Sequence, residues 1–298
     1  MSDRLYTYGV SFSRKYCRTL GVDPDDVLAF LLELGFRRFR LMSYWDQIEQ
    51  RQGEYDFSWL DEDINIISDK DGEVTLSVGL RQPRYPECHP PTWLKVLSHE
   101  DMHQAAVSFV KQTVVHYANE PAITSWQLEN EALNTGIGTC ADYCRDRIQT
   151  EFDVIKANDP RPIVMSTSSS WGNPWREPIP DIVGFSLYRS QHDGKKYKFW
   201  HFPGAFHKAR ASLVRNVLGK EVITHELQCE PWGPRSTELL SNAEQMKSMS
   251  PERLQASINY AKSTGIRTID MWGGEWWYWR ELQGDKRFAD LARKEIAG

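Results

Sequence analysis

The chain has 298 residues, enough for one large α/β barrel or for two average domains. A hydrophobic content of 40% and a charged content of 26% are ordinary for a globular protein and exclude a mainly disordered chain. The 36 basic and 41 acidic residues are scattered along the chain, so the sequence offers no basic stripe for a phosphate backbone and predicts no nucleic-acid partner.

Strands and helices are expected to alternate along the whole chain. Apolar runs of strand length recur, and most are followed by a polar loop and a segment of helical periodicity, which is typical of βα units. The first helix has Asp23 as its N-cap, Pro24 at its first position and Gly35 beyond its end. In chain order the predicted elements are strand 5–11, helix 24–34, strand 38–43, helix 58–68, strand 74–80, helix 99–118, strand 123–128, helix 141–158, strand 163–167, strand 182–187, helix 204–218, strand 221–225, helix 251–263, strand 267–271 and helix 285–296.

Eight such units predict a single (β/α)8 barrel, the TIM barrel of the α/β class, that occupies residues 1–298 as one domain. The unit after strand 163–167 has no clear helix, only the Pro-rich stretch 171–180. No break in composition, internal repeat or flexible linker indicates a second domain. In this fold the active site lies at the carboxyl ends of the strands.

Hydropathy and cysteine usage indicate whether the protein enters a membrane or an oxidising compartment. The longest strongly apolar stretch, 27–36, carries Glu33 and is too short to span a bilayer, and residues 1–4 lack the apolar region of a secretory signal. We therefore expect a soluble protein without a membrane span, cytoplasmic by default, whose oligomeric state the sequence does not specify. The cysteines are odd in number and form no CxxC motif, so free thiols are expected. They are Cys17, Cys88, Cys140, Cys144 and Cys229.

Two glutamates follow apolar runs that predict buried strands. Glu131 ends the segment 125–131 (SWQLENE), and Glu226 lies in the segment 222–227 (VITHEL). Hydrolysis of a glycosidic bond needs one carboxylic acid to protonate the leaving oxygen and one carboxylate to attack or to activate water. Glu129 competes with Glu131, because residues two apart on an extended segment face the same side. The preceding Asn130 favours Glu131.

These segments resemble those of the retaining glycoside hydrolases of clan A, which are (β/α)8 enzymes with catalytic glutamates after strands four and seven. The resemblance implies that Glu131 is the general acid and then the general base, and that Glu226 is the nucleophile of a covalent glycosyl-enzyme intermediate. It thus implies cleavage of β-glycosidic bonds with retention, by a β-glycosidase or an endo-β-glycanase acting on an oligo- or polysaccharide. The further matching segments are 39–41 (FRL), 48–49 (IE), 53–57 (GEYDF), 185–188 (FSLY) and 271–272 (MW).

Polar residues near the two glutamates are expected to bind substrate or to orient the carboxyls. Asn130 offers both a donor and an acceptor to a sugar 2-hydroxyl. Arg40, in the second strand, is expected to hold Glu226 ionised by charge and hydrogen bonding. The clan resemblance implies that Tyr188 hydrogen-bonds the nucleophile. Each residue has a structural alternative: Asn130 could be a turn or cap residue, Arg40 could form a structural ion pair, and Tyr188 could be a half-buried structural tyrosine.

Three aromatic residues complete the predicted substrate site. The clan resemblance implies that Trp272 forms the hydrophobic floor under the sugar, with core packing as its alternative. His89 follows the third strand, where clan members often place a polar sugar-binding residue. Trp45 is a candidate at the barrel rim, although aromatic residues there can simply pack the loops.

The segment 99–103 (HEDMH) matches HExxH, the helical motif in which two histidines hold zinc and the glutamate is a general base. Ser98 and Asp101 look like a helix cap, which would place His99 in an exposed first turn. No downstream segment offers an obvious third ligand. We therefore favour a solvated helix start and predict neither a metal nor an organic cofactor.

A catalytically silent, carbohydrate-binding barrel is the alternative to the enzyme, because a fold alone does not exclude it. The presence of both Glu131 and Glu226 favours the enzyme, since a binding module has no need of an acid paired with a nucleophile. A zinc protease is a third and weaker hypothesis.

Overall fold

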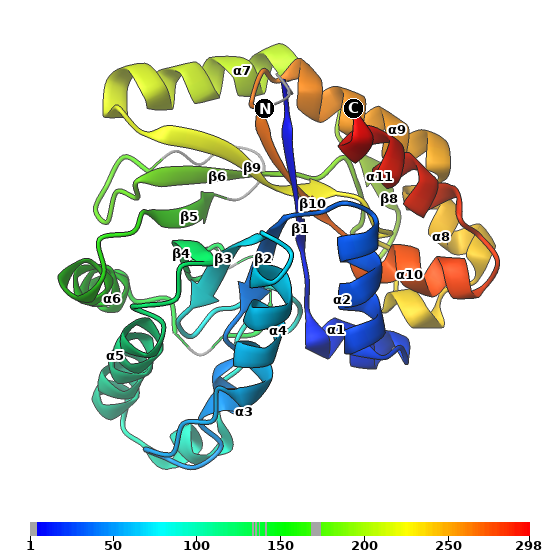
Figure 1. Ribbon diagram of the computed structural model, residues 1–298. Helices are drawn as coiled ribbons and strands as arrows, with labels where there is room; N and C mark the ends of the chain where they lie inside the picture. The colour runs from blue at the N-terminus through cyan, green and yellow to red at the C-terminus, as the bar shows by residue number, and fades with distance from the viewer. Residues whose placement is uncertain (1–4, 133, 135, 137, 141, 168–173) are drawn as a thin grey trace. The chain divides into compact units, whose positions relative to one another are not determined.

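The computed structural model describes residues 5–298 except 133, 135, 137, 141 and 168–173 (Figure 1). Its main sheet is a closed barrel with the strand order β1-β10-β9-β6-β5-β4-β3-β2, which confirms the predicted (β/α)8 fold. Neighbouring strands pair in parallel, for example with Thr7 opposite Thr268 and Val74 opposite Ile123. The barrel strands are β1 (Thr7–Ser11), β2 (Arg38–Met42), β3 (Glu73–Val78), β4 (Ile123–Leu128), β5 (Ile163–Thr167), β6 (Ile182–Leu187), β9 (Glu221–Gln228) and β10 (Thr268–Trp272).

The chain divides into two compact units, which we call the terminal unit (Met1–Phe39 and Gly184–Gly298) and the central unit (Arg40–Val183). The two boundaries fall inside β2 and β6. The central unit contains helices α3 (Trp45–Ile48), α4 (Ser58–Ser68), α5 (His99–His116) and α6 (Arg145–Asn158), with a 3₁₀ turn at Thr92–Val96. The prediction of one domain over residues 1–298 stays a prediction.

The terminal unit adds an antiparallel hairpin of β7 (Ser190–His192) and β8 (Tyr197–Phe199) after β6. Short turns lie at Val214–Leu218, where the end of α7 widens into a π-helical turn, and at Thr237–Leu239. Its helices are α1 (Arg14–Leu20), α2 (Pro24–Glu33), α7 (Gly204–Leu213), α8 (Asn242–Ser248), α9 (Pro251–Ser263), α10 (Gly274–Leu282) and α11 (Arg287–Ala297).

Local capping explains where the predicted helices begin. Asp23 accepts a hydrogen bond from the Asp25 backbone N–H at 2.9 Å and Pro24 occupies the first helical position, so α2 starts as predicted. Beyond its end Gly35 has φ +103°, a conformation that favours glycine. Ser98 caps α5 in the same way, by accepting from the Asp101 N–H at 3.1 Å.

Several elements differ from the prediction. Strand β9 continues to Gln228, because its last residues pair with β10 after a shift in register, so Glu226 lies inside the strand and not after it. The sequence did not predict four of the helices. Three of them are short, namely α1, α3 and α8, and the fourth, α10, is crowded with aromatic residues. The predicted helix-poor stretch 171–180 lies partly outside the described residues, and no helix occurs over 174–180.

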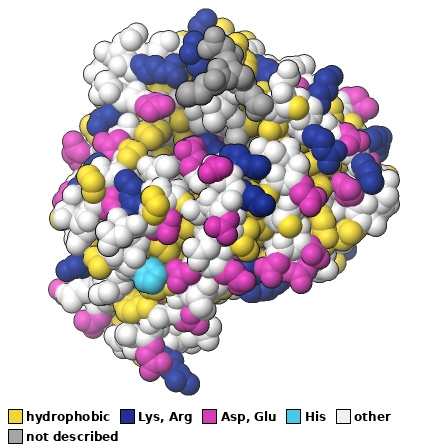
Figure 2. All heavy atoms as spheres, viewed as in Figure 1, with side chains coloured by type: hydrophobic (Ala, Val, Ile, Leu, Met, Phe, Trp, Pro, Cys, Tyr) yellow, Lys and Arg dark blue, Asp and Glu magenta, His cyan; other side chains and the backbone are white. Residues whose placement is uncertain are grey.

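The side chains on the surface agree with the charge pattern of the sequence. Basic and acidic side chains are interspersed among the described residues on the face shown in Figure 2. None of the helices described by the structure combines the length and apolar character that crossing a bilayer requires.

Candidate functional site

The segment after β4 bends sharply at two glutamates of the central unit. Glu129 and Glu131 have φ of +49° and +45°, the left-handed region that non-glycine residues rarely adopt. Two bonds fix the bend: the Asn130 N–H donates to the Arg81 carbonyl at 2.9 Å, and the Glu131 N–H donates to Ser166 Oγ at 2.8 Å. Such backbone strain persists where surrounding contacts impose it and is concentrated at functional sites.

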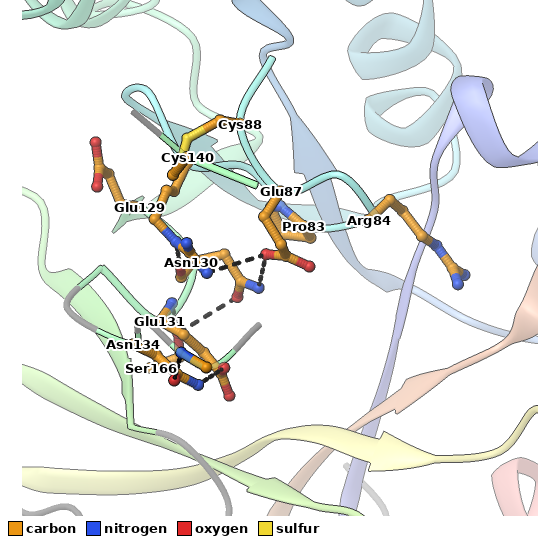
Figure 3. A network of polar contacts seen from close by, with 12 residues as sticks. Pro83, Arg84, Glu87, Cys88, Glu129, Asn130, Glu131, Asn134, Cys140 and Ser166 are labelled. Carbon is orange, nitrogen blue, oxygen red and sulfur yellow. Dashed lines mark hydrogen bonds and ion pairs between the residues drawn. A yellow bond between two sulfur atoms is a disulfide. The ribbon is translucent and has the colours of Figure 1, made fainter. Parts of the chain in front are cut away.

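The bend points the side chains of the two glutamates in different directions (Figure 3), and each has partners of its own. The Glu129 carboxylate is fully buried and accepts hydrogen bonds from the Leu80 N–H at 2.9 Å and from Arg147 Nη1 at 2.6 Å. A Cβ atom at Gly79 would lie 2.6 Å from Glu129 Cγ, so the backbone packs tightly against it. Glu131 keeps 7% of its surface exposed and accepts from Asn134 Nδ2 at 2.7 Å. The premise of an extended segment with both side chains on one side is therefore wrong.

Asn130 lies at the centre of a buried polar network. Its Oδ1 accepts from Arg40 Nη2 at 2.8 Å, and its Nδ2 donates to Glu87 Oε2 at 2.8 Å. Arg40 also donates through Nε to Gln127 Oε1 at 2.7 Å. Within the central unit Arg40 thus orients the amide of Asn130. The predicted contact of Arg40 with Glu226 stays a prediction.

Glu87 is a member of this network that sequence reasoning missed. It has φ +74°, its carboxylate oxygen lies 3.8 Å from Arg81 Nη2, and the loop that carries it is joined by a disulfide between Cys88 and Cys140. The expectation that all cysteines are free is therefore wrong for this pair, because the loops after β3 and β4 meet in space. No local motif marks Glu87, since only folding brings it to Asn130.

Two of the predicted sugar-binding residues pack inside the central unit. The ring of Trp45 is fully buried, lies 5.1 Å from the ring of Phe109 in a stacked arrangement, and donates from Nε1 to Glu49 Oε2 at 2.6 Å. This packing favours a core role for Trp45. His89 is also buried, with its Nε2 3.1 Å from the Arg84 carbonyl oxygen.

In the terminal unit, the buried Glu226 is held by a tyrosine. Tyr188 Oη donates to Glu226 Oε2 at 2.8 Å, which is the contact that the clan resemblance implies. The ring of Tyr188 meets the ring of Trp232 edge to face, with centroids 5.3 Å apart. Gln228, two residues beyond Glu226, accepts at Oε1 from the backbone N–H groups of Arg189 and Ser190, both at 3.0 Å. It thereby fixes the segment that carries Tyr188, a role that sequence reasoning missed.

The strand next to β9 carries Trp272 and a buried ion pair. Trp272 ends β10 and is mostly buried, and its backbone carbonyl accepts from the Cys229 N–H at 2.9 Å. Two residues earlier, Asp270 accepts from Arg38 Nε at 2.8 Å and lies 3.7 Å from His225 Nδ1. Burial alone would raise the pKa of Asp270, but the charge of Arg38 lowers the pKa below its ordinary value, so this carboxylate is ionised.

One group of potential metal ligands occurs among the described residues, and it consists of His99, His103 and Asp142. The two histidines belong to the HExxH segment, and the cap and the exposure of His99 agree with the expected helix start. The sequence offered no obvious third ligand downstream, but in the structure the loop before α6 brings Asp142 to both histidines.

Comparison with known proteins identifies relatives among the β-galactosidases. The profile of the β-galactosidase family, glycoside hydrolase family 42, matches residues 28–96. The β-galactosidase BgaA of Clostridium cellulovorans is 27% identical over 135 residues, which cover 39% of this chain and 20% of BgaA. The matched regions span only 20% to 33% of the length of the relatives found by sequence.

Solved structures share the barrel fold. The β-galactosidase of the Antarctic haloarchaeon Halorubrum lacusprofundi superposes with a TM-score of 0.65 at 14% identity, over 98% of this chain and 58% of that one. Xylanase 10B of Thermotoga maritima superposes with a TM-score of 0.64 at 14% identity, over 99% of this chain and 95% of that one. The structures show the common fold, and the sequence matches confirm the resemblance to clan A glycoside hydrolases.

Proposed function

We propose that this relative of the family 42 β-galactosidases hydrolyses β-galactosides with retention of configuration. The observation that carries the proposal is the 2.8 Å hydrogen bond from Tyr188 Oη to Glu226 Oε2, in the strand where the clan A resemblance puts the nucleophile. The choice of galactose is supported by the names of the relatives matched in sequence.

In the first step, Glu226 attacks the anomeric carbon while the bond from this carbon to the leaving oxygen breaks, and the carboxylic acid of Glu131 protonates that oxygen. The bond from Tyr188 occupies one oxygen of Glu226 and so orients the other one for attack. In the second step, Glu131 takes a proton from water, and the water oxygen displaces Glu226 from the anomeric carbon. Two inversions give net retention.

Neighbouring groups support Glu131 in this role. The side-chain amide of Asn134 holds one carboxyl oxygen of Glu131, and Ser166 holds its backbone N–H, so the position of the acid is fixed before substrate binds. Asn130 would meet the sugar 2-hydroxyl with an amide that Arg40 already orients. Glu129 has no part in the chemistry, because its carboxylate is committed to Arg147.

The test begins with the wild-type protein and a panel of 4-nitrophenyl β-glycosides, in which the galactoside is expected to be the best substrate and NMR is expected to show the β-anomer as the first product. Glu226→Ala should abolish this turnover, and added azide should give the α-galactosyl azide by direct attack. Glu221→Ala, at the exposed start of the same strand, is the matched control and should keep activity.

Three outcomes would count against the proposal. Wild-type turnover by Glu226→Ala would remove the nucleophile. An α-anomer as the first product would show inversion. A folded wild-type protein that binds sugars but cleaves no member of the panel would favour the silent carbohydrate-binding barrel.

A further inference from the structure

The amino-terminal turn of α5 and the loop that leads into α6 meet at three side chains with ligand chemistry. His99 Nε2 lies 3.4 Å from Asp142 Oδ1, and His103 Nε2 lies 3.1 Å from Asp142 Oδ2. The two imidazole rings are four residues apart on one helix, with centroids 4.2 Å apart. One ligand atom from each residue lies within 4.8 Å of the other two.

These spacings suit a tetrahedral ion. Zinc binds imidazole nitrogen and carboxylate oxygen at about 2.0–2.2 Å, so two ligands of a tetrahedral site lie about 3.4 Å apart. Each histidine nitrogen already lies at about that distance from one oxygen of the Asp142 carboxylate, His99 from Oδ1 and His103 from Oδ2. Nε2 of His103 is buried and makes no hydrogen bond of normal geometry to any residue that the structure describes. It is therefore available as a ligand.

The surroundings supply the outer contacts of a metal site. Arg147 Nε donates to Asp142 Oδ2 at 2.5 Å, which holds the carboxylate in place and leaves Oδ1 on the side of His99. The same guanidinium also donates to Glu129 and Glu151. Three carboxylates therefore share the single guanidinium of Arg147. Even with Glu151 protonated, one negative charge remains that a bound cation would balance. The side chain of His99 is 65% exposed, so an ion can reach the group from solvent.

We propose that His99, His103 and Asp142 bind one Zn²⁺ ion, with water at the fourth position. The ion ties the start of α5 to the loop before α6. Through Arg147 the same loop is joined to Glu129, which lies two residues before Glu131 in the chain. The role is structural, and it is independent of the proposed glycosidase activity because no step of that reaction uses the ion.

A plain histidine–carboxylate ion pair is the competing explanation, and the chain contains an internal comparison. At the other end of α5, His116 Nε2 lies 3.0 Å from Asp61 Oδ1, but no third ligand joins this pair among the described residues. His116→Ala is therefore the matched control for His99→Ala, since each removes one exposed histidine from the same helix.

The test is calorimetric titration of the whole EDTA-treated protein with zinc sulfate, supported by Co²⁺ absorption and by thermal melts. The wild type should bind one Zn²⁺ with micromolar affinity or better, give the absorption of tetrahedral Co²⁺, and melt at a higher temperature with zinc. His99→Ala and His103→Ala should each weaken binding by about tenfold or more. His116→Ala should bind like the wild type.

The ligand assignment fails if the wild type binds no zinc, or if both His99→Ala and His103→Ala bind zinc like the wild type. It also fails if binding is lost in Cys144→Ser, because the nearby free thiol would then be the ligand. His99→Ala is the decisive variant, since His99 is exposed and its loss leaves the buried Asp142–Arg147 pair intact. Activity is not the readout, so a failed glycosidase assay leaves this result interpretable.

Discussion

The two glutamates on either side of Asn130 give the sharpest test of the site, because Glu129 is bonded to a charged arginine and Glu131 to a neutral amide. Glu131→Gln and Glu129→Gln make the same chemical change two residues apart. Glu131 is proposed as the acid, and the hydrogen bond that it accepts from the neutral amide of Asn134 is one that a glutamine can still accept. Glu129 is a buried partner of Arg147 and of a backbone N–H group.

The expected magnitudes follow from these partners. Loss of general acid catalysis at Glu131 should lower kcat/KM by about 10²–10⁴-fold for lactose, whose leaving group needs the proton, and far less for 4-nitrophenyl β-galactoside. The free energy of unfolding of Glu131→Gln should change by no more than about 1 kcal/mol, the contribution of one neutral hydrogen bond. Burial raises the pKa of Glu151, the other glutamate that accepts from Arg147, so at neutral pH Glu129 and Asp142 supply the negative charge that faces Arg147. Glu129→Gln weakens a bond between charged groups and should lower the unfolding free energy by about 1.5–3 kcal/mol.

The assay pairs initial rates on the two substrates with urea unfolding followed by tryptophan fluorescence. Glu129→Gln should keep kcat/KM within about tenfold of the wild type, while Glu131→Gln should unfold closer to the wild-type midpoint than Glu129→Gln does. The opposite pattern, in which Glu129→Gln is as stable as the wild type but inactive on lactose, would contradict these roles for the two glutamates. Equal losses on both substrates in Glu131→Gln would remove it from the acid role.

Three further predictions concern separate parts of the molecule. Tyr188→Phe removes a hydrogen bond to charged Glu226 and should lower kcat/KM by about 10–100-fold; an unchanged value would show that the bond orients nothing of catalytic use. Replacing Cys88 and Cys140 by serine opens a loop that spans 52 residues and should lower the free energy of unfolding by at most about 4 kcal/mol. The measurement compares the variant with the wild type, each with and without reductant. An equal effect of reductant on both proteins would contradict this prediction. Burial lowers the pKa of His207 from 6.5 to about 4 in the folded protein. Between pH 6.5 and pH 4 the unfolded chain therefore binds a proton at this histidine that the folded protein does not bind. The free energy of unfolding should fall as the pH drops through this range. The loss is about 3 kcal/mol at most, and His207→Leu should remove it, so equal slopes of unfolding free energy against pH in the two proteins would exclude this group.

The sequence by itself determined the order of elements, because periodicity and capping are local. Eight apolar runs became the eight barrel strands, and Asp23 and Ser98 cap the helices that they were expected to start. It also placed Glu131 and Tyr188 correctly beside strand ends, since the ends of strands are set by short segments. The contact of Tyr188 with Glu226 came from the clan resemblance and not from spacing.

Only the tertiary structure decided which groups those residues meet. The left-handed bend at Glu129 separates it from Glu131, and this conformation depends on Arg81 and Ser166, which lie far away in the chain. Glu87 reaches Asn130 across a separation of 43 residues. Asp142 likewise reaches the histidines of α5 only because the barrel brings successive loops together. Polar partners that are distant in sequence leave no local pattern. The contact that commits Glu129 to Arg147 therefore arises only on folding, and so does the approach of Asp142 to the HExxH segment.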